Sequence, residues 1–235
     1  MRLVSYNVSG GLDPVSAGRV LAELAPQLVC LTEIPPAGRL RTLVRTAGLE
    51  VIARSGRRGS GTAILGAPEV RLRSSAEVPL TTPRGVPSRQ ATQAIVSVEG
   101  LRLSVTAVQF GLRPEVRRIN LEELLRFLDS IEQPTVIGCD LNESVRSPAA
   151  AGLAARFQDA HAVVGVGAGL TYPATDPSTR QDFVFVDHAL EVRAASVYVD
   201  PPVEVASHHR PVVVDLAART EPGLARDAAS GEAGA

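Results

Sequence analysis

The 235-residue sequence predicts an α/β fold, and three observations support this prediction. Short runs rich in β-branched residues recur between turn residues, which is typical of strands. Several of these runs are apolar at nearly every position, which indicates strands that are buried on both faces. Segments with helical caps and helical spacing of apolar residues lie between some of the runs, and they are fewer than the strands.

The predicted strands are distributed along most of the chain. Eight of them have a clear pattern, and they cover residues 2–8, 28–34, 61–66, 93–100, 101–110, 134–141, 181–187 and 209–216. Weaker patterns predict two further strands, at residues 76–80 and 194–199.

Three segments have the signals of helices. The first covers residues 13–24, where Asp13 is a favourable N-cap and Pro14 takes the first helical position. The second covers residues 114–130, and its leucines are spaced so that they share one face of a helix. The third covers residues 147–157 and begins, like the first, with a capping side chain followed by proline.

The composition indicates one domain over residues 1–216 and a disordered tail over residues 217–235. Hydrophobic residues make up 45% of the chain and charged residues 21%, which is ordinary for a globular core. The last segment is rich in alanine and glycine and has almost no large apolar side chain. No run approaches the roughly 20 apolar residues of a membrane span, and no signal-peptide pattern is present. We therefore expect a cytoplasmic monomer.

Charge and cysteine content limit the function classes. The formal net charge is -1, all basic residues are arginine, and aromatic residues make up only 3%. This balance provides neither a basic stripe for long nucleic acid nor many platforms for stacking bases, so it weakens a nucleic-acid substrate without excluding it. Cys30 and Cys139 lie in apolar runs, where we expect reduced packing residues rather than a disulfide or a metal cluster.

Polar side chains stand at one end of several predicted strands. If the strands share one sheet system, these ends can converge on a single cleft. Carboxylate and amide oxygens suit Mg²⁺ or Mn²⁺, and a histidine bonded to a carboxylate can move a proton or donate to a phosphate oxygen. Metal-assisted hydrolysis of a phosphate ester needs such a set. Its members are Asn7, Glu33, Asp140, Asn142, Asp182 and His209.

Each of these residues, taken alone, is also compatible with a structural role. Asn7 could form a turn, Glu33 could be a solvated strand end, and Asp140 could cap the loop that follows it. Asp182 could be an ordinary surface residue and His209 a satisfied, half-buried histidine. The order of the residues along the chain and their common context favour the functional interpretation.

Taken in order, the segments that carry these residues resemble the endonuclease/exonuclease/phosphatase superfamily, which includes DNase I-like nucleases. The matching stretches are RLVSYNVSGG, LVCLTEIPP, GTAIL, VIGCDLNE, TRQDFVFVD and SHHRPVVVDL. The resemblance implies a four-layer α/β sandwich, with two mostly antiparallel sheets face to face and helices outside. It also implies a phosphoesterase that depends on one or two Mg²⁺ or Mn²⁺ ions and hydrolyses a phosphodiester or phosphomonoester with water.

The resemblance assigns a role to each matching residue. Asn7 and Glu33 would hold the metal, and Asp140 would align and activate the attacking water. Asn142 would contact the scissile phosphate and help to fix Asp140.

The resemblance also implies which residues bind the phosphate and stabilise the charge that develops on it. Asp182 would hydrogen-bond His209, which would stabilise the charge that develops on phosphorus. Arg117 lies where many relatives have an arginine that binds phosphate, although a residue on the surface of the predicted helix at 114–130 would look the same.

Two positions depart from the family pattern. His208 stands where the family has an aspartate of the metal site, so it is a candidate ligand that would favour Mn²⁺ or another transition metal over Mg²⁺. Gln109 stands where the family commonly has a histidine, and glutamine can donate a hydrogen bond to phosphate but cannot deliver a proton at neutral pH. The alternative function is therefore a catalytically weakened protein that binds a phosphate ligand on the same fold.

The substrate class remains open between nucleic acid and a small phosphorylated molecule. The stretch RSGRRGSG at residues 54–61 contains Arg54, Arg57 and Arg58 and resembles the basic loops of inositol phosphatases. A hairpin turn explains the same residues.

Overall fold

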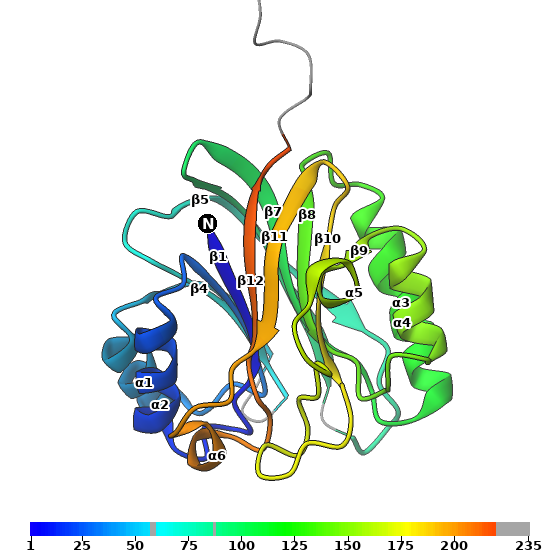
Figure 1. Ribbon diagram of the computed structural model, residues 1–235. Coiled ribbons are helices and arrows are strands. Elements are labelled where there is room, and N and C mark those ends of the chain that lie inside the picture. The colour runs from blue at the N-terminus through cyan, green and yellow to red at the C-terminus, as the bar shows by residue number, and fades with distance from the viewer. Residues whose placement is uncertain (57–59, 87, 220–235) are drawn as a thin grey trace, which may run out of the picture.

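Two six-stranded sheets pack face to face in the computed structural model, and helices cover their outer faces (Figure 1). This is the four-layer α/β sandwich that the resemblance implied. The structure describes residues 1–56, 60–86 and 88–219.

The first sheet has the strand order β11-β12-β1-β2-β4-β3. Strands β1 and β2 pair in parallel, and the other neighbouring strands pair antiparallel. The strands are β1 (Arg2–Asn7), β2 (Leu28–Thr32), β3 (Glu50–Ser55), β4 (Thr62–Gly66), β11 (Leu190–Val197) and β12 (Val212–Ala218).

The second sheet has the order β5-β6-β7-β8-β10-β9, and here β7 and β8 form the parallel pair. Its remaining neighbours pair antiparallel, so both sheets are mostly antiparallel, as predicted. The strands are β5 (Arg71–Leu80), β6 (Arg89–Val98), β7 (Leu101–Gln109), β8 (Thr135–Asp140), β9 (Gln158–Asp159) and β10 (Asp182–Val186).

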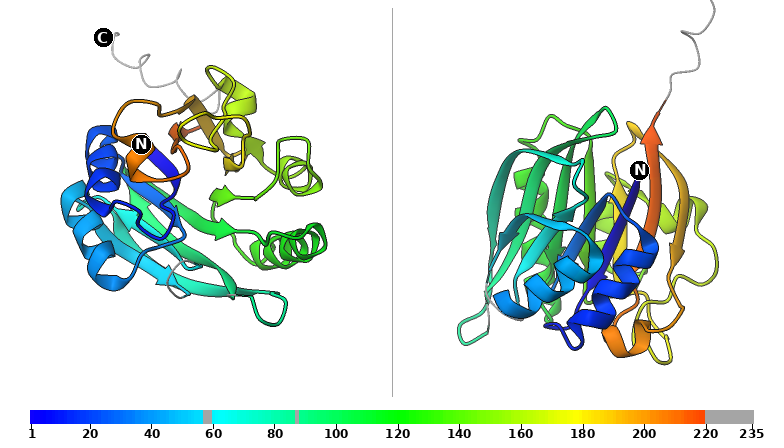
Figure 2. Two further views of the ribbon diagram at one scale, coloured as in Figure 1. Left: turned by 90° about the horizontal axis from the view of Figure 1, so that it is seen from below. Right: turned by 90° about the vertical axis from the view of Figure 1, so that its left-hand side faces the viewer.

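Helices on each outer face complete the layers, as the two views of Figure 2 show. Apolar side chains of α1 (Pro14–Leu24) and α2 (Ala37–Ala47) pack on the first sheet, and those of α3 (Pro114–Leu128) and α4 (Pro148–Ala154) pack on the second. The short helix α5 (Ala160–Val164) packs against β11 and β10, and α6 (Val203–Ala206) lies against α1.

The predicted helix starts are built as the sequence indicated. The Asp13 carboxylate accepts hydrogen bonds from the backbone N–H groups of Val15 and Ser16, and Ser147 caps α4 in the same way through the N–H of Ala150. These caps satisfy backbone donors that have no partner inside a helix.

The two sheets are in close contact at Gly138 of β8. A Cβ atom at this position would lie 2.4 Å from Cβ of Cys30 on β2 and 3.1 Å from Oγ of Ser5 on β1. Cys30 and Cys139 are both buried and free, as the sequence predicted, and burial raises the pKa of the Cys30 thiol to about 12. Glycine at position 138 therefore sets the spacing of the two layers just below the strand ends.

Replacing Gly138 by alanine is expected to destabilise the protein by about 1–3 kcal/mol, because the added methyl group overpacks the interface between the sheets. Urea unfolding followed by circular dichroism measures this change. Gly38→Ala is the matched control: its Cβ would meet nothing within 4 Å, and alanine favours the helix in which the residue lies. Equal unfolding midpoints for Gly138→Ala and the wild type would contradict the tight contact.

Several elements were not predicted. Helix α2 buries Leu40 and Leu43, and Val44 and Ala47 complete a helical spacing of apolar residues that the sequence analysis did not select. Strand β3 is an edge strand with mostly exposed or half-buried side chains, and edge strands lack the continuous apolar pattern that identified the others. The pair of weak strand patterns proved to be the ends of longer strands, β5 and β11.

The C-terminal boundary also differs from the prediction. Strand β12 continues to Ala218, so the predicted domain end at residue 216 falls inside the strand. Residues 220–235 of the predicted tail, and Arg57 and Arg58 of the basic stretch, lie outside the described residues. Among the described residues, no helix is long and apolar enough to cross a membrane.

Candidate active site at the strand ends

Three polar side chains meet on neighbouring strands of the second sheet. Gln109 is the last residue of β7, Asp140 is the last of β8 and Asp182 is the first of β10. The strand register pairs Asp140 with Gln109 on one side and with Asp182 on the other. Since side chains directly opposite each other on one face of a sheet lie close together, the three side chains form a polar row at this edge.

Asp140 is the centre of this row and is almost fully buried. Its Oδ2 accepts hydrogen bonds from Nδ2 of Asn7 and Nε2 of Gln109, both at 2.9 Å, and its Oδ1 accepts one from the backbone N–H of Asn142. Burial and the nearby charge of Asp182 raise the pKa of Asp140 to about 6, although these hydrogen bonds and the charge of His209 act in the opposite direction. The carboxylate can therefore exchange a proton near neutral pH.

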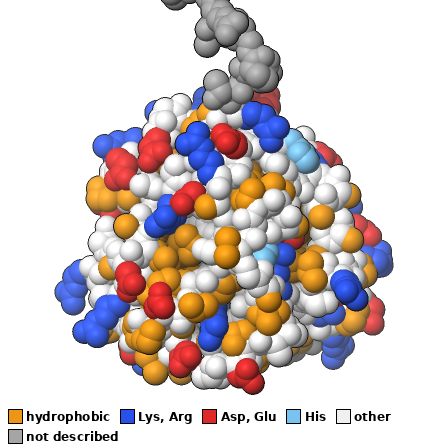
Figure 3. All heavy atoms as spheres, in the orientation of Figure 1, with side chains coloured by type: hydrophobic (Ala, Val, Ile, Leu, Met, Phe, Trp, Pro, Cys, Tyr) orange, Lys and Arg blue, Asp and Glu red, His pale blue; other side chains and the backbone are white. Residues whose placement is uncertain are grey.

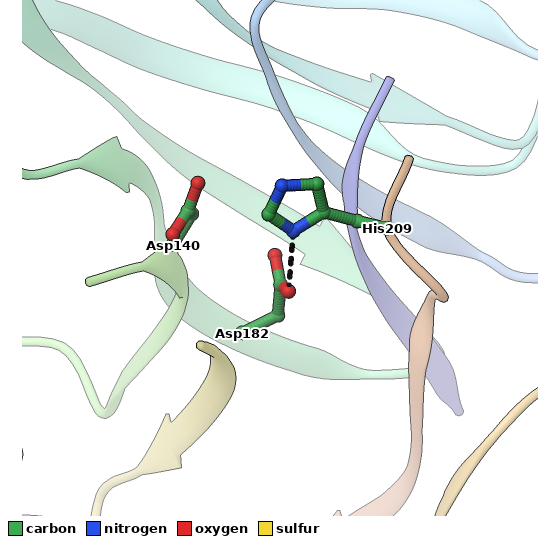
Figure 4. Close-up of side chains that lie close together, drawn as sticks. All are labelled: Asp140, Asp182 and His209. Carbon is green, nitrogen blue, oxygen red and sulfur yellow. Dashed lines mark hydrogen bonds and ion pairs between the residues drawn. The ribbon is translucent and has the colours of Figure 1, made fainter. Parts of the chain in front are cut away.

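His209 and Asp182 form a buried pair beside Asp140 (Figure 4). Nδ1 of His209 lies 2.8 Å from Oδ2 of Asp182, and the figure shows the second ring nitrogen on the side away from Asp182. Burial lowers the pKa of His209, but the charge and hydrogen bond of Asp182 and the charge of Asp140 outweigh it and raise the pKa to about 9. The protonated form of the His209 imidazole is therefore favoured at neutral pH.

Hydroxyl groups fix the backbone that carries His209. Oγ of Ser207 donates to the carbonyl of Asn7 at 2.6 Å and accepts from the backbone N–H of His209. Oγ of Ser9 lies 2.9 Å from Oγ of Ser207 and accepts from the N–H of His208. The loop that carries the histidines is thus tied to the end of β1 in the first sheet.

Glu33 reaches the same site from the other sheet. It follows β2 with a φ of +52°, an uncommon backbone conformation for a residue with a side chain. Its carboxylate accepts a hydrogen bond from Nε2 of Gln109 at 2.7 Å. Gln109 therefore connects Glu33 with Asp140, and Asn7 connects the two sheets through Asp140.

Asn142 lies at the edge of this arrangement. Its φ is +51°, and its backbone N–H binds Asp140 while its side-chain amide donates to the carbonyl of Phe110 at 2.9 Å. The backbone hydrogen bond suits a role of Asn142 in fixing Asp140, and its predicted contact with the scissile phosphate stays a prediction.

Arg89 belongs to the site although the sequence analysis did not select it. Its guanidinium donates a hydrogen bond to Oε1 of Gln109, and the charges of Glu33 and Asp140 act on it. Burial lowers the pKa of Arg89, and these two charges offset part of the effect. The position of Arg89 follows from strand pairing rather than from a motif. Arg89 begins β6, which runs antiparallel to β7, so it lies at the same end of the sheet as Gln109, the last residue of β7.

Arg117 has other partners than those predicted from the resemblance. Its guanidinium donates to the carbonyl of Leu112 at 2.6 Å and forms a nearly buried ion pair with Glu143. These contacts join α3 to the loops that follow β7 and β8. A phosphate-binding role of Arg117 stays a prediction.

His208 lies apart from the buried cluster. It is exposed, and its side chain lines a small hollow together with Tyr172 and Glu204. Its backbone is held by Ser9, and no contact with Glu33 or Asp140 is present among the described residues. The role of metal ligand stays a prediction for this residue.

The donors at the site fit a hard divalent cation. Potential ligand atoms of Asp140, Asp182 and His209 lie within 4.8 Å of one another. Oδ1 of Asp182 is buried and lacks a hydrogen-bond partner in the described part of the chain, and Glu33 adds a carboxylate nearby. Several carboxylate oxygens in one buried place are stable only with compensating positive charge, and oxygen ligands are those that Mg²⁺ and Mn²⁺ prefer.

The fold and the site identify a class of protein. A model of the Endonuclease/Exonuclease/phosphatase family matches residues 4–209, which include every predicted site residue. The chain belongs to this family, as its motifs predicted. Family membership supports a hydrolase activity of the phosphoesterase type.

Solved structures with the same fold include a conserved protein of unknown function from Enterococcus faecalis V583, with 18% identity and a TM-score of 0.82 over 93% of this chain and 100% of that one. The mannosyl-6-phosphatase Bt3783 of Bacteroides thetaiotaomicron has 15% identity and a TM-score of 0.77 over 92% and 99%. The human Nocturnin catalytic domain with bound sulfate has 16% identity and a TM-score of 0.72 over 93% of each chain. No curated protein matches the sequence of this chain.

Proposed function

We propose that the protein is a divalent-metal-dependent hydrolase that cleaves phosphate esters by attack of water. The observation that carries this proposal is the buried cluster of Asp140, Asp182 and His209, in which a carboxylate with a raised pKa lies beside an imidazolium. An acceptor and a donor of protons within one small volume are the groups that this reaction needs. The family and the similarity to a mannosyl-6-phosphatase support a phosphate ester as substrate.

Asp140 is the residue that we assign to the attacking water. A general base works best when its pKa lies near the operating pH, and the pKa of Asp140 is about 6. The amides of Asn7 and Gln109 and the N–H of Asn142 hold the carboxylate in one orientation. Water placed against Asp140 would therefore lose its proton to a fixed acceptor.

His209 is the residue that we assign to the phosphate. Asp182 orients the ring through Nδ1 and keeps the imidazole protonated, so the second ring nitrogen can donate to a phosphate oxygen. A charged donor of this kind stabilises the negative charge that grows during the reaction.

A divalent cation held by Glu33 and Asn7, next to Asp140, would polarise the phosphoryl oxygen and offset charge on the leaving oxygen. Gln109 binds both Glu33 and Asp140 and so keeps the two carboxylates in place. The amide of Gln109 can donate a hydrogen bond to the phosphate but delivers no proton to the leaving oxygen.

Arg89 supplies a further positive charge, held in place by Gln109. We expect Arg89→Met to lower kcat/KM by about 10- to 100-fold, since a hydrogen bond to a charged group contributes about 1.5–3 kcal/mol. Steady-state kinetics on one phosphate ester measures the effect. Arg102→Met is the control, because Arg102 is exposed near the start of β7, at the opposite end of that strand from Gln109. Equal losses in both variants would remove Arg89 from the site.

A protein that binds phosphate ligands without turnover is the second candidate, and Gln109 is the observation that favours it. One experiment separates the two functions. Chelator-treated protein is supplied with Mg²⁺, Mn²⁺ or Zn²⁺ separately and tested on panels of phosphodiesters and phosphomonoesters. Hydrolysis that returns with a metal supports the enzyme, whereas metal-independent binding of phosphate without hydrolysis in any panel supports the binding protein.

A further inference from the structure

A small hollow lies next to the segment that carries His209 and is lined by the two residues that precede it. Its volume is about 180 Å³. The residues that line it are Tyr172, Pro173, Ala174, Thr175, Glu204, Ser207 and His208. The loop before β10 contributes the first four, and α6 with the segment that follows it contributes the others.

The hollow adjoins the proposed catalytic histidine. The ring of Tyr172 lies 4.8 Å from the ring of His209, measured between centroids, at an interplanar angle of 46°. Tyr172 is 37% exposed, so part of its ring remains open to a ligand. The ring of Tyr172 therefore belongs both to the hollow and to the immediate surroundings of His209.

The walls of the hollow are held in place by backbone hydrogen bonds. The N–H of Ala174 donates to the carbonyl of His208 at 2.7 Å, and Nε of Arg210 donates to the carbonyl of Ala174 at 2.7 Å. The N–H of Arg210 donates to the carbonyl of Thr171, whose hydroxyl accepts from the N–H of Asp182. The hollow and the catalytic pair therefore belong to one connected unit, which suits a preformed binding site.

The side chains of the hollow define the chemistry of its ligand. Tyr172 offers an aromatic face, Glu204 an exposed carboxylate that accepts hydrogen bonds, and His208 an exposed imidazole that can donate or accept. A ring with an apolar face and several hydroxyl groups satisfies all three at once.

We infer that this hollow is a subsite for the neutral, hydroxyl-bearing ring of a phosphate ester, such as the hexose of a sugar phosphate, and that His208 recognises this ring. The inference rests on the proposed function, since it places the scissile phosphate at His209.

The charge of the hollow argues against a second phosphate group on the ring. Glu204 places a negative charge at the wall, and the guanidinium of Arg210, whose Nη2 lies 3.7 Å from that carboxylate, is engaged by it. An additional phosphate would face this carboxylate without a free cation among the described lining residues.

The test compares two substrates with the same reacting bond. Hexose 6-phosphate and propyl phosphate are both monoesters of primary alcohols, so their ratio of kcat/KM reports the ring alone. We expect a ratio of about 10 or more for the wild type, because the ring adds two hydrogen bonds and an aromatic contact that propyl phosphate lacks. The methyl diesters of the same alcohols serve if only diesters are hydrolysed.

Variants of the lining residues test whether the hollow causes the preference for the hexose ester. His208→Ala and Glu204→Gln are each expected to reduce the ratio about fivefold or more, mainly by raising KM for the hexose ester. His188→Ala and Glu191→Gln are matched controls, because both residues are exposed at the far end of β10 and in β11. These controls should keep the wild-type ratio.

Three outcomes would overturn the inference: a wild-type ratio near one, a nucleoside monophosphate preferred over the hexose ester, or equal losses on both substrates in His208→Ala together with a raised metal requirement. The last outcome would make His208 a metal ligand.

Failure of the proposed function has a different signature, since no ester would then be hydrolysed with any metal. The subsite is tested in that case by titration calorimetry on chelator-treated protein with the same two compounds. Tighter binding of hexose 6-phosphate that is lost in His208→Ala supports the subsite, and equal affinities overturn it.

Discussion

Asp140→Asn is expected to lower kcat by about 10²- to 10⁴-fold, the usual contribution of a positioned general base. The amide keeps the size of the side chain but cannot accept a proton from water. It also brings an NH₂ group toward the donors of Asn7 and Gln109, which now bind the carboxylate. Steady-state kinetics at saturating metal on the best substrate of the panel measures the loss.

The control for this variant is Asp129→Asn, an exposed carboxylate at the end of α3 that pairs with Arg156. It makes the same chemical change far from the polar row and should retain the wild-type kcat. Circular dichroism verifies that both variants are folded. A kcat within about twofold of the wild type for Asp140→Asn would exclude this carboxylate as the base.

His209→Gln is expected to lower kcat by about 10²- to 10³-fold, the effect of removing one preorganised charged donor. Glutamine can still donate a hydrogen bond, but it carries no charge and cannot be held by Asp182 in the same way. In the wild type the imidazolium exists below its pKa of about 9. The rate should therefore fall as the pH rises through about 9 in the wild type, and this limb should be absent from His209→Gln.

The pH dependence of protein stability provides a second test of the pair formed by His209 and Asp182. A folded pKa above the unfolded value means that the pair stabilises the protein fully below about pH 6.5 and that this contribution is lost as the pH rises through about 9. Thermal unfolding of His209→Gln should lack this pH-dependent contribution, whereas His188→Gln, an exposed histidine after β10, should keep it. A high-pH limb that persists unchanged in His209→Gln would assign it to another group.

Most central strands could be predicted from the sequence pattern because they are buried on both faces, whereas the sandwich itself followed from the family resemblance. Strands such as β8 and β10 have continuous apolar runs, and their polar ends stand out for that reason. The edges of the sheets were harder to predict. Strand β3 and helix α2 bury few side chains fully, and α5 and α6 are too short to show a helical period, although Asp159 caps α5.

The residues of the candidate site could also be predicted only in part from the sequence. The motifs pointed to Asn7, Asp140 and Asp182 because each interrupts an apolar run. Arg89 was missed because its significance depends on strand register: only the antiparallel pairing of β6 with β7 brings it to Gln109. The different environments of the neighbouring residues His208 and His209 follow from the backbone between α6 and β12, which no sequence pattern specifies.

A single turnover in H₂¹⁸O tests most directly whether Asp140 activates water at this site. Enzyme in excess over a phosphate ester is quenched after one turnover, and mass spectrometry locates the label. Direct attack of water on phosphorus predicts one ¹⁸O atom in the phosphate-bearing product and none in the released alcohol, at a rate that Asp140→Asn reduces. An unlabelled phosphate product from the first turnover would contradict this mechanism, because its new oxygen would then come from the protein or the bond to carbon would have broken.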